Sequence, residues 1–60
     1  MAIVCFHLYE NPNGKLYKSV EIDADDRALN ANEVQTLKTS VAKKEGGNRF
    51  MIILHGIYHV

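Results

Sequence analysis

Along the first ten residues, the polarity of the side chains alternates in the way that is typical of a strand in a small sheet. From residue 2 to residue 8 the even-numbered residues are all apolar, whereas the odd-numbered ones mix apolar with polar side chains, so one face is expected in a core. The core parity consists of Ala2, Val4, Phe6 and Leu8, and the opposite parity of Ile3, Cys5, His7 and Tyr9. The pattern predicts a strand over residues 2–10.

A turn and a second strand follow. Residues 11–14 read Asn-Pro-Asn-Gly, which is a strong turn signal. Pro12 sets φ for the second position of a type I turn, and Gly14 can adopt the left-handed conformation. The second strand is predicted over residues 15–23.

The type of turn decides which residues of the two strands face each other. A two-residue loop would put Phe6 opposite Glu21, whereas a G1 bulge at Gly14 puts Phe6 opposite Val20, so the bulge is favoured. The bulged register pairs Val4 with Ile22, Cys5 with Glu21, Phe6 with Val20, His7 with Ser19, Leu8 with Lys18 and Tyr9 with Tyr17.

A helix is predicted over residues 31–45. Asn30 is a good N-cap, and Glu33 three residues later completes a variant of the capping box. An apolar stripe at helical spacing follows, formed by Val34, Leu37 and Val41. Two glycines, Gly46 and Gly47, end the helix.

The last segment, residues 49–59, is predicted to be a strand that is apolar on both parities. Residues 50–54 read Phe-Met-Ile-Ile-Leu, and no formally charged residue follows Arg49. Such a strand is usually buried on both faces, yet one helix can cover only one face of a sheet.

The order of elements is therefore β-β-α-β, an α+β fold in one small domain. We expect a three-stranded mixed sheet with the helix on one face. The strand order 2-1-3 is preferred over 1-2-3, because the first strand is more continuously apolar than the second and so suits the central position. The last strand is then an edge.

This arrangement leaves an apolar sheet face and an uncharged sheet edge without a partner. Contiguous apolar patches and long uncharged edges usually mark interaction surfaces. We expect a homodimer, formed by edge pairing of the last strand, by packing of the open faces, or by both. The residues predicted to make contact are Tyr9, Tyr17, Met51, Ile53, Ile57 and Tyr58.

Length and composition narrow the classes of protein to which the chain can belong. Sixty residues form one domain that needs support beyond its own core, and a single cysteine, Cys5, rules out an internal disulfide. The absence of a signal-peptide pattern together with one cysteine favours the cytoplasm. The apolar runs at residues 1–6 and 50–54 are both far too short to span a membrane.

The candidate metal ligands do not form a known site. His55 and His59 share a parity but lie about 13 Å apart along a strand, and His7 and Cys5 are expected on the same face. No zinc-binding spacing is present, so no metal and no cofactor are predicted. Cys5 faces Glu21, and a carboxylate is the wrong neighbour for a reactive thiol, so no catalytic group is predicted either.

The sequence therefore indicates a non-enzymatic protein-binding module, of a size typical of bacterial and phage accessory or inhibitor proteins. The alternative is nucleic-acid binding by the basic end of the helix. Net charge is zero, but cations gather late in the chain, at Lys38, Lys43, Lys44 and Arg49.

Overall fold

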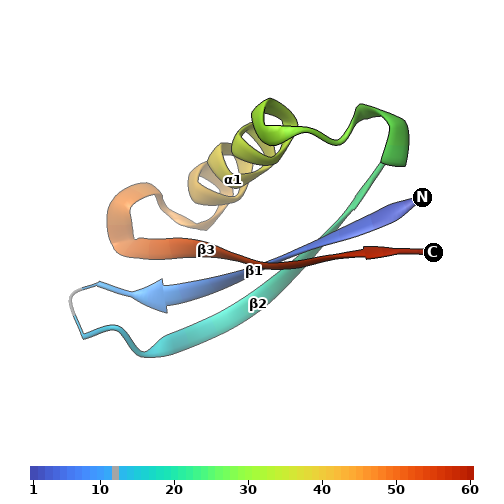
Figure 1. Ribbon diagram of the computed structural model, residues 1–60. Helices are drawn as coiled ribbons and strands as arrows, with labels where there is room; N and C mark the ends of the chain where they lie inside the picture. Colours follow the sequence, from blue (N-terminus) through green and yellow to red (C-terminus); the bar gives the residue numbers. More distant parts are fainter. Residues whose placement is uncertain (12) are drawn as a thin grey trace.

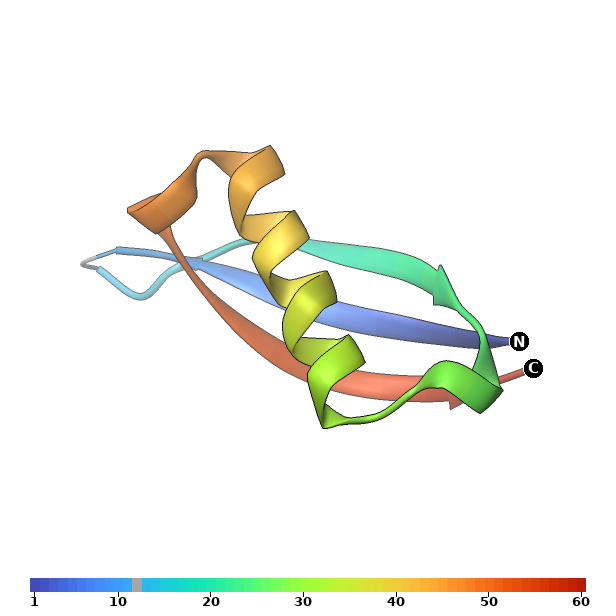
Figure 2. The same cartoon turned by 90° about the horizontal axis from the view of Figure 1, so that it is seen from above.

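The fold has the order β1–β2–α1–β3, with a short 3₁₀ turn on each side of the helix. In the computed structural model, described for residues 1–11 and 13–60, three strands form a single sheet with α1 across one face (Figures 1 and 2). The elements are β1 (Ala2–Glu10), β2 (Leu16–Ala24), η1 (Asp26–Ala28), α1 (Ala31–Glu45), η2 (Gly47–Arg49) and β3 (Phe50–His59). The predicted bounds of the helix match, and each predicted strand is confirmed to within a residue at either end.

The strand order is β2-β1-β3, as predicted. Both pairs of neighbouring strands are antiparallel, so the sheet is antiparallel rather than mixed. Only β2 and β3 run in the same direction, and β1 lies between them. Of the two strands of the hairpin, the more continuously apolar one, β1, is thus central, which agrees with the burial expected of a strand that has neighbours on both sides.

Local signals fix the ends of α1. The Asn30 side-chain oxygen accepts a hydrogen bond from the Glu33 N–H at 2.9 Å, and Gly46 adopts the left-handed conformation with φ of 111°. Both features were predicted from sequence, because Asn is a preferred N-cap and Gly a preferred residue after a helix end.

The core lies between α1 and one face of the sheet. Its buried side chains are Val4, Phe6, Leu8, Val41 and Ile52. Partly buried side chains surround them, namely Val20, Ile22, Ala24, Leu29, Val34, Leu37, Ala42, Phe50 and Ile57. Ile57 therefore belongs to the core, where the sequence pattern had placed it on the open face.

The register between β1 and β2 is as predicted from Val4–Ile22 to Leu8–Lys18, but it changes beside the turn. Tyr9 pairs with Leu16 instead of Tyr17, so the shift of one residue occurs at Tyr17 and not at Gly14. Gly14 does have a positive φ of 72°. The expected role of Pro12 in the turn lies outside the described residues.

The bulge at Tyr17 has a visible cause. The Tyr17 ring stacks on Phe50, with ring centroids 4.7 Å apart, and Phe50 packs against the core. The extra residue lets Tyr17 reach the helix side of the sheet. Its predicted place on the open face was wrong, and Leu16 pairs with Tyr9 of that face instead.

A second bulge lies in β3. Phe6 pairs with Leu54 and Cys5 with Gly56, so His55 is an extra residue without a partner position on β1. Beyond this point the parity of β3 is reversed. Ile57 consequently faces the core and Tyr58 faces away from it, because one added residue exchanges the two faces of a strand.

Candidate functional site

The open face of the sheet is the side of β1 and β3 that α1 does not cover (Figure 2). Its β1 side chains alternate with the core residues and are Ile3, Cys5, His7 and Tyr9. Across from them on β3 are Met51, Ile53, His55 and Tyr58. On β2 the same face carries Ser19, Glu21 and Asp23, so its apolar part lies toward the β3 edge.

β3 exposes apolar side chains on both faces of the sheet. Met51 and Ile53 on the open face are 47% and 45% exposed, and Leu54, which pairs with Phe6 of the core parity, is 41% exposed. Tyr58 is also exposed. Within the described chain, β3 pairs only with β1, so its other edge offers backbone groups to a partner strand.

The two sheet edges differ in charge. β2 presents Lys18, Glu21 and Asp23, and charged side chains are one of the means by which edge strands avoid pairing. The Lys18 ammonium is also held by the Glu45 carboxylate at 2.8 Å, which joins β2 to the end of α1 and raises the pKa of Lys18. β3 has no formally charged residue. The β3 edge is therefore the one suited to strand addition.

The predicted contact residues fall into two groups. The structure brings Tyr9, Met51 and Ile53 together at one end of the open face, and Tyr58 lies on the same face at its other end, beside Ile3. Tyr17 lies at the helix side against Phe50, and Ile57 packs on the core, so these two do not join the patch. Sequence reasoning placed His55 on the same face as His7 but did not predict that the two rings stack, and Gly56 within the strand was a signal for the bulge at His55.

The three histidines do not share one site. His7 and His55 lie on a common face, as predicted, and their rings stack with centroids 4.0 Å apart, whereas His59 bonds to Asp26 at the other side of the bulge. Among the residues that the structure describes, no three or more His, Cys, Asp or Glu side chains are grouped to hold a metal ion. Cys5 is buried and its thiol is free.

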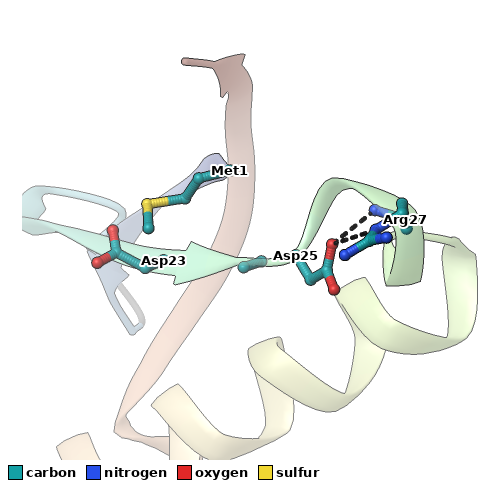
Figure 3. A pocket seen from close by; sticks show the side chains of 5 residues that line it. Met1, Asp23, Asp25 and Arg27 are labelled. Atoms are coloured by element: carbon teal, nitrogen blue, oxygen red, sulfur yellow. Dashed lines mark hydrogen bonds and ion pairs between the residues drawn. The ribbon is translucent and has the colours of Figure 1, made fainter.

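One end of the molecule is acidic. A cavity of about 370 Å³ there is lined by Met1, Asp23, Ala24, Asp25 and Arg27 (Figure 3). The guanidinium of Arg27 faces the Asp25 carboxylate at 3.7 Å, so the cation of this cavity already has an ion partner. Nearby, Asp26 binds the N-terminal ammonium at 2.7 Å and His59 at 2.9 Å.

The opposite end is basic. The β1–β2 turn, the last turn of α1 and η2 meet there (Figure 1), and they carry Lys15, Lys43, Lys44 and Arg49. Lys38, also predicted for nucleic-acid contact, lies half-buried in the middle of α1, away from this group. Glu10 and Glu45 partly offset the positive charge of this end.

Comparison of the chain with protein-family models, with curated proteins and with solved structures finds no match. In the described chain, no helix is both long and apolar enough to cross a membrane. A functional assignment therefore has to come from the geometry of the open face, the β3 edge and the two charged ends.

Proposed function

We propose that the protein is a non-enzymatic binding module that assembles as a homodimer through the free edge of β3. The exposure of apolar side chains on both faces of this uncharged edge strand carries the proposal. A partner strand beside β3 would contact both faces at once, whereas packing of the open faces alone would leave Leu54 in water. Strand addition also gives a partner to the unpaired backbone groups of the edge.

The pattern of side chains favours one register. The segment Phe50–Leu54 precedes the bulge and is regular. If two copies pair antiparallel about a twofold axis at Ile52, Met51 meets Ile53 of the second copy on the open face. Phe50 likewise meets Leu54 of the second copy on the helix side. Every residue of the segment then faces an apolar residue, which is the match that fixes a register.

Charge supports the antiparallel direction. Each chain has a basic end beside Arg49, at the start of β3, and an acidic end beside Asp26, where β3 finishes. An antiparallel pair directs the basic end of one copy toward the acidic end of the other, while a parallel pair would place like ends together. Complementary charge of this kind sets orientation more than affinity.

In this role the chain is an accessory or inhibitor protein of the cytoplasm, and the open face adjoining the dimer contact remains for a further protein. Tyr9 and Tyr58 are suited to that contact, since aromatic side chains are enriched at interfaces. The buried free thiol of Cys5 suits a reducing compartment.

Sedimentation velocity over a concentration series tests the dimer. The wild-type chain should shift from monomer to dimer as its concentration rises through the micromolar range. Ile53→Lys should remain monomeric, because it places a charge in the paired segment. Ser19→Lys, the same type of change on the exposed β2 edge, is the matched control and should dimerise like the wild type. A wild-type chain that stays monomeric throughout contradicts the proposal.

Nucleic-acid binding is the second candidate, since the fold gathers Lys15, Lys43, Lys44 and Arg49 at one end. Such binding would show as anisotropy of a labelled oligonucleotide that falls steeply with salt. The double variant Lys43→Glu/Lys44→Glu should abolish it and leave the dimer intact. No binding by the wild type at low salt removes this candidate.

A further inference from the structure

The β3 bulge creates a pair of stacked histidines at the border of the proposed dimer contact. His55 is the extra residue of the bulge, and its ring lies 4.0 Å from that of His7, with 12° between the two planes. Bulges commonly change the direction of a single side chain. Here the bulge places the imidazole of His55, on the edge strand β3, over that of His7, on the central strand β1.

The surroundings of the pair contain little that could neutralise two positive charges. On β1, the Tyr9 hydroxyl lies 3.4 Å from Nδ1 of His7, and Cys5 is on the same face. On β2, Ser19 is opposite His7, and the nearest carboxylate by register is that of Glu21, opposite Cys5 and exposed to water. On β3, Ile53 is opposite His7. The helix lies on the other face of the sheet.

We propose that protonation of His7 and His55 dissociates the homodimer, so that assembly is favoured at neutral pH and weakened in mildly acidic solution. This inference rests on the proposed function, because the pair can act on assembly only if the second copy lies along β3.

The second copy makes protonation costly in two ways. In the register centred on Ile52, the paired strand ends at Phe50 of the second copy, and Arg49, the last residue of η2 just before it, brings a permanent cation to the side of the contact on which His55 lies. The added strand also removes water from the edge on which His55 lies, and burial disfavours the charged form of an imidazole. In the free monomer His55 is exposed and can turn away from His7 when both are charged.

Histidine side chains change charge between about pH 5 and 8, so the effect is expected in that interval. Sedimentation velocity at about pH 7.5 and about pH 5.5 measures it. The dimer dissociation constant of the wild type should rise at least about fivefold at the lower pH, given the repulsion of two unit charges about 4 Å apart.

Variants separate this pair from other titrating groups. His7→Phe/His55→Phe keeps two stacked rings without proton sites and should change its dissociation constant less than about twofold between the two pH values. His59→Phe, a histidine outside the pair, should retain the pH dependence of the wild type. Circular dichroism at both pH values establishes that each variant is folded.

The outcomes also distinguish the two proposals. A wild type that is monomeric at about pH 7.5 overturns the proposed dimer itself. A wild type that dimerises equally well at both pH values leaves the dimer standing and overturns the histidine regulation. If the dissociation constant of the His7→Phe/His55→Phe variant still depends on pH as in the wild type, the assignment of the effect to this pair is overturned.

Discussion

Asn30 contributes to stability through a single hydrogen bond at the start of α1. Its side-chain oxygen accepts from the Glu33 N–H, one of the backbone donors that a helix start leaves unpaired. Asn30→Ala should lower the free energy of unfolding by about 1 kcal/mol, measured by urea unfolding. Gln35→Ala, an exposed change on the same helix, should stay within about 0.5 kcal/mol of the wild type. Equal effects of the two changes would contradict the capping role.

Asp26 couples the stability of the acidic end to pH. The N-terminal ammonium and then His59 lower the pKa of the Asp26 carboxyl, and the carboxylate in turn raises the pKa of the ammonium. A carboxyl whose pKa is lowered in the folded state stabilises the fold at pH values above its unfolded pKa, and this stabilisation is lost as pH falls through the folded pKa. An amine whose pKa is raised in the folded state stabilises the fold at pH values below its unfolded pKa, and this stabilisation is lost as pH rises through the folded pKa.

The free energy of unfolding should therefore decrease as pH falls below about 4 and as it rises above about 8. Asp26→Asn should unfold more easily at neutral pH and show a flatter profile on both sides. Urea unfolding across the pH range measures both profiles. A variant whose profile parallels that of the wild type would show that this ion pair does not contribute.

At the scale of the elements, two glycines with different backbones should respond differently to the same change. Gly46 has a φ of 111° and ends α1, so Gly46→Ala should cost about 1 kcal/mol. At Gly56 a new Cβ would lie 3.3 Å from the Tyr58 hydroxyl oxygen, the far end of an exposed side chain that can move. Gly56→Ala should therefore stay within about 0.5 kcal/mol of the wild type. Thermal unfolding of both variants checks the contrast, and a larger loss at Gly56 would contradict it.

The regular parts of the elements were predictable from sequence, and the bulges were not. From Ala2 to Leu8 the pairing with β2 follows from matching apolar residues, and the ends of α1 follow from Asn30 and Gly46. The bulges arise from contacts between distant residues. Tyr17 leaves its expected face because Phe50, far along the chain, offers a ring to stack on.

The candidate site was affected more than the core, because its residues follow the bulges. Ile57 lies in the core instead of on the open face, because the extra residue His55 reverses the parity of β3 after it. Met51 and Ile53 precede the bulge, and their place on the open face was predicted correctly. Gly56 within the apolar strand was the available signal for a bulge. Where the bulge forms, and which residue it adds, depends on the side chains that the partner strand presents.

The proposed pairing of β3 makes a prediction about two neighbouring residues. In the register centred on Ile52, a cysteine at position 51 of one copy lies opposite a cysteine at position 53 of the other. Met51→Cys/Ile53→Cys in a Cys5→Ala background should therefore form a disulfide-linked dimer on mild oxidation. Electrophoresis without reductant detects it.

A matched variant controls for random collision of exposed thiols. Glu21→Cys in the same Cys5→Ala background places a thiol on the exposed β2 edge, and it should remain largely monomeric under the same oxidation. Equal cross-linking of both variants would contradict pairing through β3 in this register.

For the whole molecule, the limiting feature is that one helix covers one face of a three-stranded sheet. A domain of 60 residues buries only about 60% of the surface of its unfolded chain, so an uncovered apolar face is a large part of what remains. The molecule is also elongated, 36 Å by 17 Å by 16 Å, and the charged residues at its two ends are of opposite sign. A second copy along β3 adds buried area without requiring a larger core in either chain.

If assembly supplies part of the stability, the midpoint of thermal unfolding must depend on protein concentration. A partner that binds only the folded chain stabilises it by mass action, so the wild-type midpoint should rise by several degrees for a hundredfold increase in concentration, roughly from 5 to 500 µM. Ile53→Lys should unfold at a midpoint independent of concentration, near that of the dilute wild type, because its paired segment is blocked while its core is unchanged. Differential scanning calorimetry measures both. A wild-type midpoint that does not move with concentration would mean that the monomer alone accounts for the stability of the fold.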